Sequence, residues 1–233
     1  MIIVANLKTN LTRSATHQYM EVVDRCIQNS AQEVIVFPAT ASLDCFDTKL
    51  TIGAQNAYPV EKGAFTGEIG LEHLEEFNIK TILIGHSERR HILGESQEFI
   101  AKKFDYFKAQ GFQIIYCVGE PLEVRESSKE AMLAYLDEQY EGIDTDYENL
   151  IIAYEPVWAI GTGKIPTLAN IEDVQAQLKK KSQAPLLYGG SVKVDNVKDI
   201  LQVKNVDGVL VGSAALCAEH FCSMIQVADA LTL

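Results

Sequence analysis

The sequence predicts a single-domain α/β protein, residues 1–233, built as a (β/α)8 barrel. Eight short runs rich in β-branched residues recur along the chain, helical patterns lie between most of them, and no change in composition or flexible linker divides it. Alternating strands and helices imply parallel strands joined by right-handed crossovers. Eight such units can close into a barrel, and the alternative is a doubly wound open sheet.

Each predicted strand is an apolar run of the length typical of a buried strand. Barrels of this kind usually exceed 233 residues, so we also expect trimmed helices and loops. The eight runs are Ile2–Ala5, Val34–Phe37, Leu50–Ala54, Thr81–Ile84, Ile114–Val118, Leu150–Tyr154, Leu186–Tyr188 and Gly208–Val211.

Helical periodicity fills most of the gaps between these runs. Within 95–110, apolar residues recur at three-to-four spacing and Gly111 follows at the C′ position, where glycine commonly ends a helix. Ser127 and Glu130 fit a capping box that opens the next helix. The predicted helices cover 14–29, 95–110, 128–140, 168–181, 194–202 and 214–231, with a short one near 41–48.

Composition narrows the classes of function. A net charge of −12 argues against nucleic acid and anionic membranes as partners, and no apolar run is long enough to span a membrane. The N-terminus lacks the pattern of a signal peptide. Five cysteines form no paired framework, so we expect free thiols in a reducing cytoplasm. An anionic substrate would need a local positive site.

Polar residues gather just past the strand ends, where a barrel places its active site. This repetition is hard to explain by stability alone, and it predicts a site at that end of the barrel. In chain order these residues are Asn6, Lys8, Gln55, Asn56, His86, Ser87, Glu88, Cys117, Gly119, Glu120, Glu155, Gly189, Gly190, Ser191, Gly212 and Ser213.

The segment after the sixth predicted strand combines a carboxylate with the features of a lid. Glu155 ends the strand, and Pro156 stops it. An apolar middle and a glycine-rich tip follow, which suits proton abstraction away from water. The lid residues are Pro156, Val157, Trp158, Ala159, Ile160, Gly161, Thr162, Gly163 and Lys164. An ordinary surface loop is the alternative.

Two glycine-rich turns after the last two strands both lead into helices, so their free N–H groups and the helix dipole predict a phosphate site, with tight turns that simply need glycine as the alternative. His86 precedes a charged helical turn, and an imidazole there can stay neutral and donate a hydrogen bond. Lys8 supplies a positive charge beside the first strand. Neither a metal-binding set of residues nor a cofactor motif is visible. These groups suit cofactor-free proton transfer next to the carbonyl of a small phosphorylated compound.

Seven motifs in order along the chain resemble those of the triosephosphate isomerase family over nearly its whole length. They are Asn6-x-Lys8, Gly53–Asn56, Gly63–Glu68, Gly85–Arg90, Cys117–Glu120, Ala153–Lys164 and Tyr188–Ser191. The resemblance implies a TIM barrel that interconverts glyceraldehyde 3-phosphate and dihydroxyacetone phosphate in glycolysis and gluconeogenesis, without a cofactor.

The resemblance also implies a role for each residue. Glu155 moves the proton, neutral His86 polarises the carbonyl, Lys8 with Asn6 stabilises the enediolate, and Glu88 holds Lys8 and His86 in place. Phosphate binds the N–H groups of Gly161, Ser191, Gly212 and Ser213, and Tyr188 with Ser191 latches the closed lid. The family forms cytoplasmic homodimers, in which Phe65 and Thr66 lie on a loop that enters the partner's site.

Three residues depart from the family pattern. Leu7 replaces an aromatic residue, and Ser213 replaces a glycine whose N–H alone is needed. Pro166 replaces alanine at the end of the lid, which predicts a stiffer hinge. Two alternatives stay open at this point: another phosphosugar isomerase or epimerase, and a non-catalytic barrel that binds phosphometabolites.

Overall fold

The computed structural model describes residues 1–160 and 166–232, and its strands close into one parallel barrel. Neighbouring strands pair in chain order, and β1 also pairs with β8, with Ile2 opposite Gly208. This closure confirms the predicted barrel and excludes the open sheet. The strands are β1 Ile2–Asn6, β2 Glu33–Phe37, β3 Thr51–Ala54, β4 Thr81–Ile84, β5 Gln113–Val118, β6 Leu150–Tyr154, β7 Leu186–Tyr188 and β8 Gly208–Val211.

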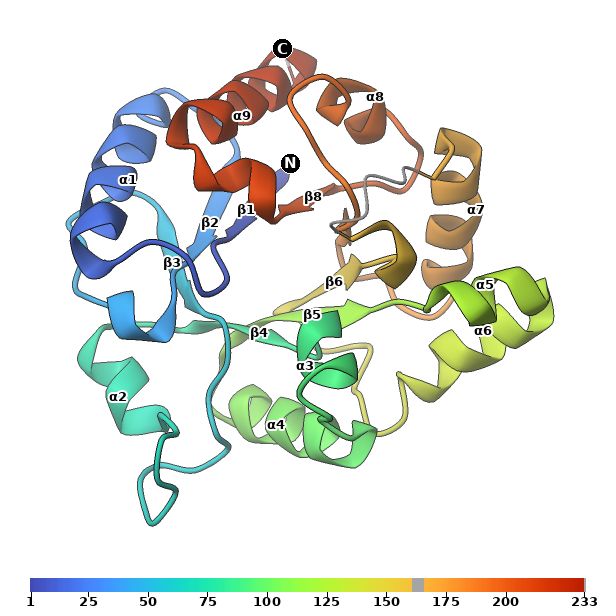
Figure 1. The fold of residues 1–233 in the computed structure, drawn as a ribbon, viewed down its shortest axis with the longest axis horizontal. Helices are drawn as coiled ribbons and strands as arrows, with labels where there is room; N and C mark the ends of the chain where they lie inside the picture. The colour runs from blue at the N-terminus through green and yellow to red at the C-terminus, as the bar shows by residue number, and fades with distance from the viewer. Residues whose placement is uncertain (161–165, 233) are drawn as a thin grey trace.

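Helices surround the barrel and cover its outer face (Figure 1). The first and last helices, α1 and α9, pack against each other and complete the ring. The α-helices are α1 Arg13–Cys26, α2 Leu71–Glu76, α3 Ser87–His91, α4 Gln97–Ala109, α5 Leu122–Ser127, α6 Lys129–Glu138, α7 Leu168–Leu178, α8 Val197–Leu201 and α9 Ala218–Thr232. Short 3₁₀ helices are η1 Thr40–Ser42, η2 Val157–Ala159 and η3 Ser213–Leu216.

Two hydrophobic layers follow from the alternation of side chains along each strand. One set of alternating residues fills the barrel interior, and the other packs against the helices. On β6, Ile151 and Ala153 belong to the interior set, so Glu155 continues that set at the rim. The interior set comprises Val4, Ile35, Phe37, Leu83, Ile115, Cys117, Ile151, Ala153, Leu187 and Leu210.

The helices differ from the prediction in several places. The helix expected near 41–48 is only the 3₁₀ turn η1, because the chain has few residues in which to reach β3. The expected capping box is off by one residue: Ser128 caps α6 by accepting the N–H of Ala131, and Ser127 ends α5. The short helices α2 and α5 were missed. Gly111 takes a left-handed φ of 72° after α4, as expected.

Candidate active site

A cavity of about 310 Å³ opens at the carboxyl ends of the strands, where the predicted residues meet. Lys193, an exposed residue in this wall, is not among the residues predicted from the sequence. Its only sequence signal is its place two residues after Ser191. The wall consists of Asn6, Lys8, His86, Glu155, Ile160, Gly189, Gly190, Ser191, Val192, Lys193, Leu210, Gly212, Ser213 and Ala214.

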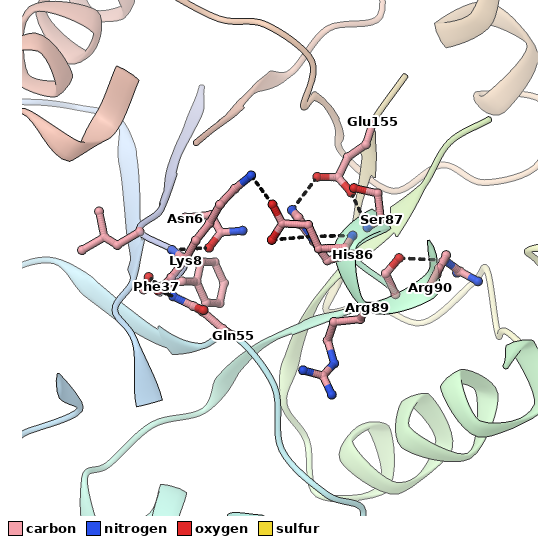
Figure 2. Close-up of polar contacts among 12 residues, drawn as sticks. Asn6, Lys8, Phe37, Gln55, His86, Ser87, Arg89, Arg90 and Glu155 are labelled. Atoms are coloured by element: carbon pink, nitrogen blue, oxygen red, sulfur yellow. Dashed lines mark hydrogen bonds and ion pairs between the residues drawn. The ribbon is translucent and has the colours of Figure 1, made fainter. Parts of the chain in front are cut away.

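Lys8 is held at the cavity by its backbone as well as by its side chain (Figure 2). Its φ is 53°, a left-handed value that costs an ordinary residue roughly 1–2 kcal/mol. Two contacts hold this conformation: the Lys8 N–H donates to Asn6 Oδ1 at 3.0 Å, and Gln55 Nε2 donates to the Lys8 carbonyl at 2.8 Å. Lys8 Nζ pairs with Glu88 Oε1 at 2.5 Å. The ammonium group is therefore fixed at the cavity wall by β1, β3 and α3.

His86 is the N-cap residue of α3 and is buried. Its Nδ1 accepts the Glu88 N–H at 3.2 Å, and its Nε2 lies 3.0 Å from Glu155 Oε1. Burial lowers the pKa of His86 and the Glu155 carboxylate raises it, with a net upward direction. A cationic ring would, however, need a proton on Nδ1, where the Glu88 N–H already points. The geometry therefore favours a neutral ring with its proton on Nε2.

Glu155 lies directly after β6 and is only 2% exposed. Its Oε2 accepts the Ser87 N–H at 3.1 Å, while its Oε1 faces His86. Burial acts to raise the pKa of this carboxyl group, but His86, the Ser87 N–H and Lys8 outweigh burial and lower it. The lowered pKa keeps Glu155 a carboxylate at neutral pH, so it can accept a proton. These two contacts come from His86, the N-cap residue of α3, and from Ser87, the first residue of that helix.

Two glycines let the backbone approach Glu155 closely. A Cβ at Gly189 would lie 2.9 Å from Glu155 Cγ, and a Cβ at Gly119 would lie 1.7 Å from the Glu155 carbonyl oxygen. Neither glycine has a left-handed φ, so space and not backbone strain requires them. Glu155 is thus packed between the ends of β5 and β7.

The predicted phosphate side is formed by the turns after β7 and β8. Ser191, Gly212 and Ser213 all line the cavity, and a Cβ at Gly212 would lie 3.3 Å from Lys8 Cε. One expectation is wrong in part: the turn after β7 does not lead straight into a helix, because α8 begins only at Val197. The backbone N–H groups of these turns, rather than a helix dipole, are the available anion donors at Ser191.

Only the first part of the predicted lid is described. Pro156 to Ile160 includes the 3₁₀ turn η2, and Ile160 lines the cavity. Trp158 Nε1 donates to Glu120 Oε1 at 3.2 Å, and the Tyr154 hydroxyl donates to the same oxygen at 3.0 Å. The predicted lid residues Gly161, Thr162, Gly163 and Lys164 lie outside the described residues.

Tyr188 and Glu120 form the buried surroundings of this lid segment. The Tyr188 hydroxyl has no hydrogen-bond partner among the described residues, and a Cβ at Gly190 would lie 2.2 Å from it. Burial raises the pKa of Glu120, which the contacts from Trp158 and Tyr154 lower in part. The predicted latch between Tyr188, Ser191 and the lid stays a prediction.

The remaining predicted residues lie elsewhere. Phe65 and Thr66 are exposed on a segment before α2 that extends away from the barrel (Figure 1). Phe65 stacks on Tyr58 with ring centroids 4.2 Å apart, and it remains 40% exposed. Leu7 is fully buried.

Within 1–160 and 166–232, no group of three or more His, Cys, Asp or Glu residues could hold a metal ion. The same part of the chain contains no helix long and apolar enough to cross a membrane.

Comparisons with known proteins agree with this geometry. A family model described as triosephosphate isomerase matches residues 1–228. The triosephosphate isomerase of Sulfurimonas denitrificans is 61% identical over 231 residues, which cover 98% of this chain and 96% of the relative. That of Sulfurovum is 56% identical over 97% of this chain and 99% of the relative. That of Helicobacter pylori is 47% identical over 97% of this chain and 98% of the relative.

Proposed function

The chain belongs to the triosephosphate isomerase family, and we propose that Glu155, His86 and Lys8 perform its reaction. The protein is an intramolecular isomerase that interconverts glyceraldehyde 3-phosphate and dihydroxyacetone phosphate, a step of glycolysis. The observation that supports this assignment of residues best is the contact of His86 Nε2 with Glu155 Oε1 at 3.0 Å on the cavity wall. The proposed base Glu155 and the proposed hydrogen-bond donor His86 therefore face the same part of the cavity.

The proposed reaction begins when the substrate takes the place of the contact between His86 and Glu155. The Glu155 carboxylate removes a proton from the carbon next to the carbonyl, and the electron pair moves onto the carbonyl oxygen. This forms an enediolate. The protonated Glu155 then returns the proton to the carbon that carried the carbonyl. At the same time the proton of the adjacent hydroxyl passes to the original carbonyl oxygen, with His86 Nε2 as the proposed carrier, and the carbonyl reforms one position along. Because Glu155 gives the proton back, its carboxylate is regenerated and no other reactant is needed.

His86 and Lys8 stabilise the negative charge of the enediolate. A neutral imidazole with its proton on Nε2 donates a hydrogen bond to the substrate oxygen. Such a preorganised donor acts in a water-poor site without reorganisation. Lys8 adds a fixed positive charge, and its pairing with Glu88 at 2.5 Å keeps the ammonium in place. Asn6 supports Lys8 through the backbone contact described above.

The phosphate group would occupy the opposite side of the cavity. Its proposed donors are the backbone N–H groups of Ser191, Gly212 and Ser213, together with Gly161 of the lid. Closure of the segment 156–164 would exclude water while the enediolate exists, with Tyr188 as a latch. The position of Ile160 in the cavity wall supports this role for the segment.

We further propose a cytoplasmic homodimer in which the loop of Phe65 and Thr66 enters the partner's site. Exposed apolar side chains support an interface at two places in the chain: Phe65 on this loop, at 40% exposure, and Ile92 and Leu93 directly after α3, at 76% and 63%. Exposed apolar side chains mark a protein contact where they form a contiguous patch, and Ile92 and Leu93 are neighbours in the chain. Sedimentation of wild type and of Phe65→Ser tests this: the wild type should be a dimer and the variant should dissociate.

The experiment that tests the catalytic assignment is a coupled assay of glyceraldehyde 3-phosphate conversion without added metal, with Glu155→Gln beside the wild type. We expect fast turnover that falls by roughly 10²–10⁴ in the variant, the range for loss of a general base. Binding of inorganic phosphate should change little, because the phosphate donors are separate from Glu155. A variant that keeps wild-type turnover would show that Glu155 is not the base.

A further inference from the structure

Gln139 makes a pair of hydrogen bonds to the peptide group of Gly119, directly beyond the end of β5. The Gly119 N–H donates to Gln139 Oε1 at 2.9 Å, and Gln139 Nε2 donates to the Gly119 carbonyl at 2.9 Å. The glutamine is only 6% exposed. One side-chain amide therefore satisfies both polar groups of one buried residue.

The direction of these bonds shows what Gln139 replaces. In a parallel ladder, alternate residues bond to opposite neighbouring strands. The Val118 carbonyl faces β6, where it accepts the Glu155 N–H at 2.8 Å. Gly119 is the next residue, so its N–H and carbonyl face the other side, toward β4. Because β4 ends at Ile84, no strand is left there, and the Gln139 amide occupies the place of the missing ladder partner.

Gln139 bonds the segment 118–120, and the backbone of Glu155 is hydrogen-bonded to the same segment. Besides the bond from Glu155 to Val118, the Val157 N–H donates to the Glu120 carbonyl at 3.1 Å. Gly119 lies between these two bonds and against the Glu155 backbone, where a Cβ would approach the carbonyl oxygen to 1.7 Å. A shift of Gly119 would therefore move the backbone of Glu155 and of the first lid residues.

Gln139 is itself firmly held. It is the C-cap residue of α6, and its carbonyl accepts the Tyr116 hydroxyl and Gln97 Nε2, the latter at 2.9 Å. Tyr116 also receives Arg90 Nη2 at 2.9 Å, and Arg90 Nε donates to the carbonyl of Gly85, the residue before His86. The glutamine thus belongs to a buried network that runs from α6 to the start of α3.

We propose that Gln139 is a positioning residue for the catalytic base Glu155. Through the peptide group of Gly119, Gln139 fixes Glu155 relative to His86. The proposal rests on the assignment of Glu155 as the base. On this proposal α6, which has no side chain in the cavity, stabilises the end of β5 through its C-cap residue Gln139. It does so at the point beyond Ile84, where β4 has ended and no longer pairs with β5.

The test compares Gln139→Met with wild type in steady-state kinetics. Methionine keeps the length of the side chain and removes both hydrogen bonds. We expect kcat to fall about 10- to 100-fold, since a misplacement near 1 Å can cost that much, while KM and inhibition by inorganic phosphate stay nearly unchanged. The primary deuterium isotope effect on kcat should rise with substrate labelled at the carbon that loses its proton. A merely structural role would lower the melting temperature without changing the isotope effect.

A second variant gives a signature specific to the paired hydrogen bonds. In Gln139→Glu, a protonated acid can accept from the Gly119 N–H and donate to its carbonyl, whereas the carboxylate repels that carbonyl. Its kcat relative to wild type should therefore rise as the pH falls. This variant also supplies the answer if Gln139→Met does not fold. A pH profile parallel to that of wild type would overturn the proposal.

The matched control is Gln113→Met at the amino end of the same strand, where Gln113 bonds Glu33 and Thr81. It should lose stability but keep kcat and the isotope effect. Glu155→Gln in the same assay separates the two proposals. If that variant keeps its turnover, the assignment of the base is wrong. If Glu155→Gln collapses while Gln139→Met matches wild type per folded molecule, only the role of Gln139 is wrong.

Discussion

Replacing Gly189 by alanine would push a methyl group toward the side chain of Glu155. The new Cβ would lie 2.9 Å from Glu155 Cγ, 3.3 Å from the Tyr154 carbonyl and 3.6 Å from Leu210 Cβ. Carbon atoms pack best at about 3.5–4.0 Å, so Glu155 has to retreat by roughly 0.6–1.1 Å if the strand stays fixed. The φ of Gly189 is not left-handed, so the backbone itself tolerates alanine.

We expect Gly189→Ala to lower kcat by about 10²-fold, the loss associated with a displacement near 1 Å at the reacting groups. KM should change little, since the phosphate donors do not move with Glu155. The assay is steady-state kinetics in both directions, with inhibition by inorganic phosphate as a measure of the intact phosphate side. Gly212→Ala is the control, because its Cβ would meet Lys8 Cε at 3.3 Å, and a shift of a few tenths of an ångström in the methylene chain relieves this contact while Nζ keeps its pairing with Glu88. Its kcat should fall much less. A folded Gly189→Ala enzyme with wild-type kcat would refute the reasoning.

Four further predictions concern individual groups. His86→Ala should lower kcat by about 10²–10³, as the removal of one preorganised donor does elsewhere, and steady-state kinetics check this. Lys193→Gln should raise KM roughly threefold to tenfold at low salt, the size expected of one charge acting on a dianion through water, and should weaken the salt dependence of kcat/KM with kcat unchanged. Pro166→Ala should change turnover and the rate of lid exchange measured by NMR, because proline restricts both itself and the residue before it; two unchanged rates would exclude a stiffer hinge. Glu120 has a raised pKa, so the folded state binds its proton more tightly and loses stability as the pH rises above the ordinary value of 4.5. Urea unfolding from pH 4 to 9 should therefore show Glu120→Gln gaining stability relative to wild type with rising pH.

The strands could be predicted because each is a buried run of β-branched residues. The presence of eight of them, alternating with helices, predicted the barrel. The short helices could not. With six residues each, α2 and α5 have too few turns to show a hydrophobic period. The capping box failed by one residue because Ser127 and Ser128 are chemically equivalent, and only the end of α5 selects Ser128 as the cap.

The residues of the site likewise fall into those that could be predicted from the sequence and those that could not. Residues directly after a strand, such as Lys8, His86 and Glu155, could be found because chain position and chemistry agree. Gln139 could not, since it lies at the end of a helix and acts on a peptide group 20 residues earlier in the chain. Lys193 gave only a weak signal, because most lysines are solvated surface groups.

The alternation of side chains along the strands explains why the cavity lies where it does. The interior is filled by Leu187 on β7 and Leu210 on β8, and the next interior positions are Gly189 and Gly212. A Cβ at Gly189 would point at Glu155, and one at Gly212 at Lys8. The cavity therefore begins where the interior positions are glycines without side chains, next to the Glu155 carboxylate and the Lys8 ammonium group. Residues larger than alanine at these two positions should remove catalysis while the barrel below them stays packed.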